Sequence, residues 1–199
     1  MDQAIETTIG KLKAATDLLD RKQVNELCVR LIAQLHRANA PLEVEPAKHV
    51  LGNLRRKRFF TAMQHVADAL MQTGQNAPVV RRQYAQSLID RGALIAATAV
   101  LRELAADVPD DAEARGLLGR VHKQRYVEAS RYTAGLTRPA PARSADALRE
   151  SIRWYYGPYQ QNPEENYWHG INAVACASRA RRDGVANDVV ADTRVIASR

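Results

Sequence analysis

Residues 78–111 read "PVVRRQYAQSLIDRGALIAATAVLRELAADVPDD", and this stretch determines the fold. Its apolar residues recur at the three-and-four spacing of two successive amphipathic helices. Gly92 separates the helices, because a residue without Cβ permits the tight helix-to-helix turn. Ala97, Leu101 and Leu104 share one face of the second helix, and Pro109 stops it. The stretch therefore predicts an antiparallel helix pair.

The same spacing recurs on both sides of this pair. Upstream, the matching positions are Ala62, Val66, Ala69 and Gly74. Downstream, once an insertion rich in Pro, Ala, Thr and Ser over residues 129–146 is removed, they are Ser151, Tyr155, Pro158 and Pro163. Registered copies at a fixed period indicate a stack of repeated helix pairs.

The register divides the chain into a hairpin, four repeats and a cap. An N-terminal helical hairpin covers 1–43 and a C-terminal capping helix covers 186–199. The repeats are predicted over 44–77, 78–111, 112–163 with the insertion, and 164–185. No segment alternates at period two over a strand's length, so we expect an all-α solenoid of about ten helices. Pro158 lies inside one of these helices and should kink it or end it early.

The repeats resemble the tetratricopeptide repeat (TPR) family. The resemblance covers roughly residues 44 to 182 and includes Leu118–Gly119 in the third repeat. In the second repeat it is carried by Tyr84–Ala85, Leu88, Gly92, Ala97, Leu101, Leu104 and Pro109. It implies a curved stack whose first helices line a concave, partner-binding groove.

A narrower resemblance concerns "LLGRVHKQRY" (117–126) and "SIRWYYGPYQQNPEENYWHGINAV" (151–174). These segments are similar to the TPR-like TRAF-binding domain of apoptosis-signalling MAP kinase kinase kinases and bacterial effector-associated or defence proteins. Because no kinase motif accompanies them, the resemblance implies only a scaffold or sensing role. The sequence "DTRVIASR" stops without a helix cap, which is consistent with the regulatory part of a longer polypeptide.

Composition sets limits on location and partners. The formal net charge is +7, which favours acidic partners. No apolar run is long enough for a transmembrane helix and no signal peptide is recognisable, so we expect a cytoplasmic protein without a membrane partner. Cys28 and Cys176 fall in helical patterns, and both are expected to be buried and reduced.

Catalytic motifs are absent from the sequence. There is no nucleophile elbow, dinucleotide-binding or P-loop glycine pattern and no H-E-x-x-H. The five histidines lie one per predicted helix, without ligand spacing to each other or to the cysteines. We therefore expect no enzyme activity, no metal and no cofactor.

The aromatic residues near the C-terminus have two interpretations. Tyr155 and Tyr167 fall at positions that fill the space between adjacent helix pairs, so both are expected to be buried. Trp168 falls on the groove side, where it is either a binding anchor or packed against the C-terminal helix.

The groove-facing positions give the candidate binding residues, which are Arg82, Gln86, Arg120, Lys123, Trp168 and Asn172. Arginine can hold a carboxylate with two hydrogen bonds, and asparagine can bind backbone amides. The opposing interpretation is that these cations are simply solvated.

The leading hypothesis is a non-catalytic TPR scaffold that binds an acidic or C-terminal peptide of a partner in its groove, in a signalling or bacterial defence system. The alternative is a basic nucleic-acid-binding helical module, suggested by "LRRKRFF" (54–60). A third hypothesis is self-association through an exposed end of the stack.

Overall fold

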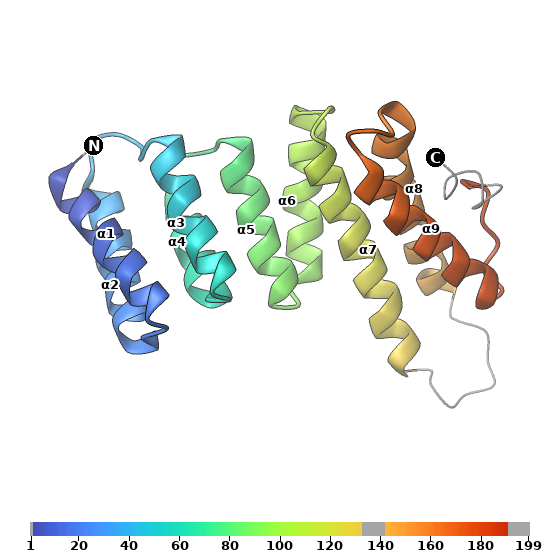
Figure 1. The fold of residues 1–199 in the computed structure, drawn as a ribbon, viewed down its shortest axis with the longest axis horizontal. Coiled ribbons are helices and arrows are strands. Elements are labelled where there is room, and N and C mark those ends of the chain that lie inside the picture. Colours follow the sequence, from blue (N-terminus) through green and yellow to red (C-terminus); the bar gives the residue numbers. More distant parts are fainter. Residues whose placement is uncertain (1, 133–141, 191–199) are drawn as a thin grey trace. The chain divides into compact units, whose positions relative to one another are not determined.

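Nine α-helices make up the computed structural model, which describes residues 2–132 and 142–190 and contains no strand within them. The chain divides into two compact units, Met1–Val100 (unit 1) and Leu101–Arg199 (unit 2), with the division inside α6. Figure 1 shows the helices connected as successive up-and-down pairs. The all-α repeat fold is confirmed, with nine helices in the described residues where about ten were predicted.

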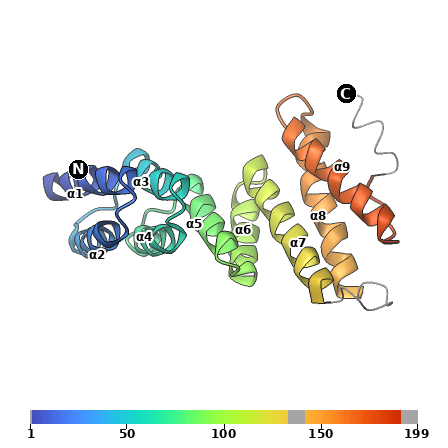
Figure 2. The same cartoon turned by 60° about the horizontal axis from the view of Figure 1, so that its bottom comes forward.

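Unit 1 contains five complete helices and the start of a sixth. They are α1 (Gln3–Asp17), α2 (Arg21–Arg37), α3 (Val44–Arg56), α4 (Phe60–Gln72), α5 (Pro78–Asp90) and the first residues of α6 (Leu94–Asp107). Helices α1 and α2 pack on each other, as do α3 and α4, and α1 and α2 also pack on α3 and α4 respectively (Figure 2). One continuous apolar core connects α1 to α5, because each of these helices contributes buried apolar residues to it.

Side-chain caps fix the first two helix starts. The Asp2 carboxylate accepts from the Ala4 backbone N–H at 2.8 Å, and that of Asp20 accepts from Gln23 N–H at 3.0 Å. Both satisfy N–H groups that have no partner inside the helix.

Unit 2 contains the end of α6, then α7 (Ala112–Tyr132), α8 (Ala142–Gln161) and α9 (Tyr167–Arg182). Helix α8 packs against both α7 and α9. The insertion predicted over 129–146 is partly helical, since α7 continues to Tyr132 and α8 begins at Ala142; residues 133–141 lie outside the described residues. Residues 186–190 of the predicted capping segment form no helix, and the rest of that segment also lies outside the described residues.

The residues that define the repeat behave as the spacing predicts. Ala97, Leu101 and Leu104 are fully buried, and Gly92 has a φ of +80°, the left-handed conformation that favours glycine. A kink or an early end was expected at Pro158, and α8 continues past it to Gln161. The Pro158 carbonyl accepts from Asn162 N–H and from the Asn166 side-chain amide, both at 3.1 Å, and these bonds hold the last turn. The early helix end allowed by the sequence is therefore wrong.

Candidate partner-binding site

Glycines on α7 let α8 and α9 approach closely. A Cβ on Gly119 would lie 2.8 Å from the Tyr155 ring on α8. A Cβ on Gly116 would lie 2.7 Å from the His169 ring and 3.2 Å from the Trp168 ring, both on α9. Because these distances are shorter than van der Waals contact, only glycine fits at either position.

An aromatic cluster fills the space that these glycines leave. Tyr155 and Trp168 meet edge to face with ring centroids 5.7 Å apart, and Trp168 and His169 do so at 5.2 Å. The Tyr155 ring is fully buried, as predicted, whereas Trp168 keeps 49% of its surface exposed. The cluster thus holds a partly exposed indole on a rigid base.

Polar contacts connect α7 and α9 along their length. His169 Nε2 lies 2.8 Å from the Ala112 carbonyl oxygen at the start of α7. Further along, the Lys123 ammonium donates to Asn172 Oδ1 at 3.0 Å. At the far end, the Tyr126 hydroxyl and the Arg179 guanidinium both donate to the Asp183 carboxylate. These contacts fix which side of each helix faces outward.

Burial sets the protonation of the cluster. It raises the pKa of Tyr155, so the phenol stays neutral, and it raises the pKa of the Cys176 thiol, which lies 3.4 Å from Ser151 Oγ. Burial also lowers the pKa of His169, despite the opposing hydrogen bond to the Ala112 carbonyl. The Lys123 ammonium lies next to this cluster, 5.5 Å from the Tyr155 ring centroid.

Three of the six predicted site residues come together in unit 2. Lys123 binds Asn172, and the Asn172 amide donates to the Trp168 carbonyl oxygen at 2.9 Å. Arg120 is half-buried on α7, about one helical turn before Lys123. Arg82 and Gln86 belong to α5 in unit 1, where both are half-buried and Gln86 donates to Asp90 at 2.6 Å. A groove that joins all six residues stays a prediction.

The prediction that Tyr167 is buried is wrong, since 65% of its surface is exposed. Tyr167 begins α9 and is not among its buried residues, which include His169, Gly170 and Ala173. Tyr159 of α8 occupies the space instead, against Gly170, where a Cβ would lie 2.5 Å from the Tyr159 ring.

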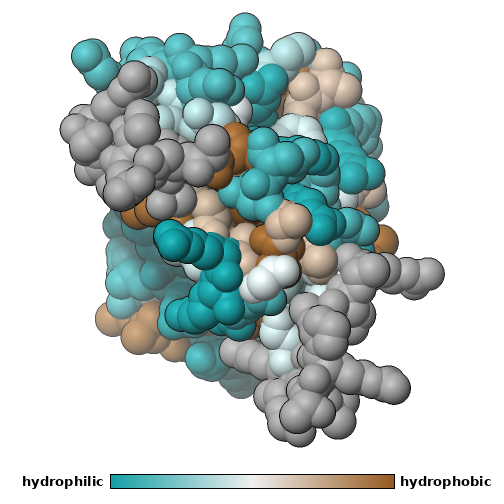
Figure 3. All heavy atoms as spheres, turned by 90° about the vertical axis from the view of Figure 1, so that its right-hand side faces the viewer, coloured by the Kyte–Doolittle hydropathy of each residue, from teal (hydrophilic) through white to brown (hydrophobic). Residues whose placement is uncertain are grey.

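Sequence reasoning missed the exposed apolar side of α9. Ile171 follows Tyr167 by one helical turn, and both are exposed beside Trp168. The four-residue spacing of Tyr167 and Ile171 could have indicated from the sequence that they share one side of the helix. In the space-filling view of the side where α8 and α9 lie, hydrophobic atoms emerge between hydrophilic side chains (Figure 3).

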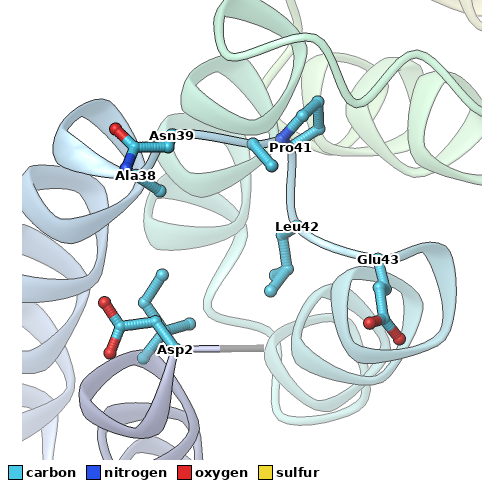
Figure 4. A pocket seen from close by; sticks show the side chains of 8 residues that line it. Asp2, Ala38, Asn39, Pro41, Leu42 and Glu43 are labelled. Atoms are coloured by element: carbon cyan, nitrogen blue, oxygen red, sulfur yellow. The ribbon is translucent and has the colours of Figure 1, made fainter.

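A cavity of about 360 Å³ lies in unit 1, between the start of α1 and the loop from α2 to α3. Ile5, Pro41 and Leu42 contribute apolar lining. The carboxylates of Asp2 and Glu43 lie at separate places on the rim and do not point toward one another (Figure 4). The cavity therefore lacks convergent polar groups that would orient a ligand.

No group of three or more His, Cys, Asp or Glu side chains in residues 2–132 and 142–190 is placed to hold a metal ion. None of the helices in this part of the chain combines the length and apolar content needed to cross a membrane. Cys28 and Cys176 are buried and form no disulfide, as predicted.

Comparison with known proteins gives one match. The model of a family described as "TPR-S: Tetratricopeptide Repeats-Sensor" matches residues 58–177, which include the second repeat and most of the α7–α9 region. No curated protein and no solved structure matches the chain.

Proposed function

Because the chain belongs to the Tetratricopeptide Repeats-Sensor family, we propose that unit 2 binds an acidic segment or the C-terminal carboxylate of a protein partner. TPR-type domains are in general non-catalytic protein-interaction scaffolds, and this chain is of that type. The binding residues in the proposal are Arg120 and Lys123 on α7 and Trp168 and Asn172 on α9. Arg82 and Gln86 in unit 1 stay a prediction.

The observation that carries the proposal is that the Lys123 ammonium has only neutral partners among the described residues. This ammonium contacts a neutral amide oxygen at 3.0 Å and the face of the Tyr155 ring, and no carboxylate of the described residues lies within 4 Å of it. A partly buried cation with neutral partners gains more from an incoming carboxylate than a cation that is already paired.

The neighbouring side chains fit the rest of a peptide. The exposed part of the Trp168 indole offers an apolar contact, as binding hot spots commonly do, and it meets the same Tyr155 ring as the Lys123 ammonium. Asn172 presents an amide that can exchange its bond to Lys123 for one to a peptide backbone. The proposal includes a regulatory or sensing role in the cytoplasm, where both thiols stay reduced.

Peptide titration tests the proposal with defined probes. Short random peptides that end in a free carboxylate or contain Asp and Glu are compared with amidated, Asn- and Gln-substituted versions, with Trp fluorescence as the readout. We expect the acidic set to bind and the neutral set to fail. The charge reversals Arg120→Glu and Lys123→Glu together should weaken binding at least about tenfold, because each changes an attraction into a repulsion.

Arg181→Glu is the control, because Arg181 is an exposed cation of unit 2 that lies on α9 outside the proposed binding residues. It should retain binding, and far-UV circular dichroism should show equal helicity in all variants. Equal binding of neutral and acidic peptides, or equal loss in the control, would contradict the proposal.

A further inference from the structure

Two helices of unit 1 end in a left-handed residue that is not glycine. Helices α4, α5 and α9 end with Gly74, Gly92 and Gly184 at positive φ. The equivalent residues after α1 and α3 are Leu19, with a φ of 57°, and Arg58, with a φ of 61°. The left-handed conformation is unfavourable for a residue with a Cβ, so glycine would be the more stable choice at both positions.

The backbone hydrogen bonds show that these are the same type of turn. The Asp20 N–H donates to the Ala15 carbonyl at 3.1 Å, and the Phe59 N–H donates to the Leu54 carbonyl at 2.9 Å. The glycine turn after α5 has the same closure, from Ala93 N–H to the Leu88 carbonyl at 2.9 Å. Since the turns are otherwise alike, a Leu and an Arg at the strained positions indicate a use for those side chains.

Direct contacts join the two turns into one surface. Lys57 Nζ lies 3.7 Å from Asp17 Oδ1, and the Arg21 guanidinium lies 5.9 Å from the centroid of the Phe59 ring. Both turns lie at the same end of their helix pairs (Figure 1). We define the basic turn surface as residues 18–22 and 55–58.

This surface combines protruding apolar side chains with cations. Leu18 and Leu19 are 79% and 58% exposed. The exposed cations around them are Arg21, Lys22, Arg55, Arg56, Lys57 and Arg58. The nearby carboxylates are engaged, since Asp17 pairs with Lys13 and Lys57 and Asp20 caps α2.

We propose that the basic turn surface docks unit 1 onto an anionic phospholipid bilayer. Lipid phosphates and carboxylates attract the cations, while the two leucines enter the boundary between headgroups and acyl chains. A nucleic acid would satisfy the cations but would leave both leucines exposed to water. No membrane partner was expected from the sequence because it has no apolar run long enough to span a bilayer. Docking on the bilayer surface does not need such a run.

The strained turn residues provide the test. Leu19→Gly and Arg58→Gly are combined in one variant, which removes one exposed leucine and one cation. The double variant should unfold at a higher temperature or denaturant concentration, because glycine relieves the left-handed strain. Its binding to vesicles should nevertheless fall about tenfold or more, since a cation near the surface and a buried leucine each contribute on that scale.

Co-sedimentation with vesicles measures the binding. The probes are vesicles of phosphatidylcholine alone and vesicles of an equal mixture of phosphatidylserine and phosphatidylcholine. The full chain should sediment only with the mixed vesicles, and less at high salt. The matched control is Val29→Ser with Arg30→Gln, which removes one exposed apolar residue and one cation from the middle of α2 and should bind like the parent.

Each outcome decides the proposal. Loss of binding in the more stable glycine variant, with binding kept in the α2 control, supports it. No sedimentation of the parent with anionic vesicles at low salt overturns it, as does equal binding by the parent and the glycine variant. Binding to random duplex DNA without binding to vesicles also overturns it and favours the nucleic-acid alternative.

Discussion

Replacing Gly119 with alanine should destabilise unit 2, although alanine is the better helix former. The new Cβ would lie 2.8 Å from Cδ2 and 2.9 Å from Cε2 and Cγ of the Tyr155 ring. Carbon atoms in favourable contact are about 3.5 to 4.0 Å apart, so the ring must retreat by roughly 0.7 Å. The ring is fully buried and in contact with Trp168, which leaves it no open space.

The magnitude follows from two opposing effects. Overpacking a well-filled core costs about 1 to 3 kcal/mol, and a fully buried aromatic ring places this site near the upper value. Exchanging glycine for alanine inside a helix returns up to about 1 kcal/mol. We therefore expect Gly119→Ala to lower the free energy of unfolding by about 2 kcal/mol.

Urea unfolding followed by tryptophan fluorescence measures this effect selectively. The chain has two tryptophans, Trp154 and Trp168, and both lie in unit 2. The control is Gly52→Ala on α3, where a Cβ would meet no atom within 4 Å. Gly52→Ala should stabilise unit 1 by about 0.5 to 1 kcal/mol, and urea unfolding monitored by circular dichroism measures this change.

A double-mutant cycle then attributes the cost to the ring. Tyr155→Leu should cost less in the Gly119→Ala background than in the parent, because it removes the atoms that the new Cβ meets. A Gly119→Ala variant as stable as the parent would refute the packing argument, and so would additive effects of the two changes.

Two further predictions concern titration in unit 2. Burial lowers the pKa of His122 to about 4, opposed by Glu150 and assisted by Arg125 and Arg102. The unfolded chain then takes up the proton first, so stability should be complete above about pH 6.5 and fall by up to about 3 kcal/mol toward pH 4, as urea midpoints across that range would show. His122→Leu should remove this part of the pH dependence; an unchanged slope would contradict the assignment. Burial alone raises the pKa of Asp183, but hydrogen bonds from Tyr126 and Arg179 outweigh it and leave that pKa below its usual value. Asp183→Asn should therefore lower the free energy of unfolding of unit 2 at neutral pH by about 1 to 3 kcal/mol, which a lower urea midpoint would show. The difference from the parent should shrink in acid, once the pH falls below the usual pKa of aspartate and the parent's carboxylate takes up a proton. A midpoint unchanged at neutral pH would show that the contact contributes nothing.

The repeat itself could be predicted because its signal is periodic and local. Ala97, Leu101 and Leu104 lie one turn apart and are fully buried, so their spacing alone identifies the buried face of α6. Gly92 was equally readable, since a glycine between two helical patterns commonly takes the left-handed conformation. The turns at Leu19 and Arg58 were not readable, because neither residue type indicates a positive φ.

The candidate site was harder to predict because α9 carries apolar residues on every side. Tyr167, Trp168 and Ile171 compete with Ala173 for the interior, and their spacing does not decide between them. Close contacts across helices decide it. Gly170 fits against Tyr159 and Gly116 against His169, and neither position has space for a Cβ. Such contacts depend on residues far apart in sequence, so local periodicity could not reveal them.

These glycine contacts also connect the packing of unit 2 to its proposed binding surface. With Gly170 held against α8 and His169 against the start of α7, the next side of α9 must point outward, which leaves Trp168 half exposed. The same rotation places Asn172 Oδ1 3.0 Å from the Lys123 ammonium, and both the indole and this ammonium lie against the Tyr155 ring. A Cβ at Gly116 would meet both His169 and Trp168, and it would turn α9 away from α7. The position of the proposed binding residues thus depends on Gly116 having no side chain.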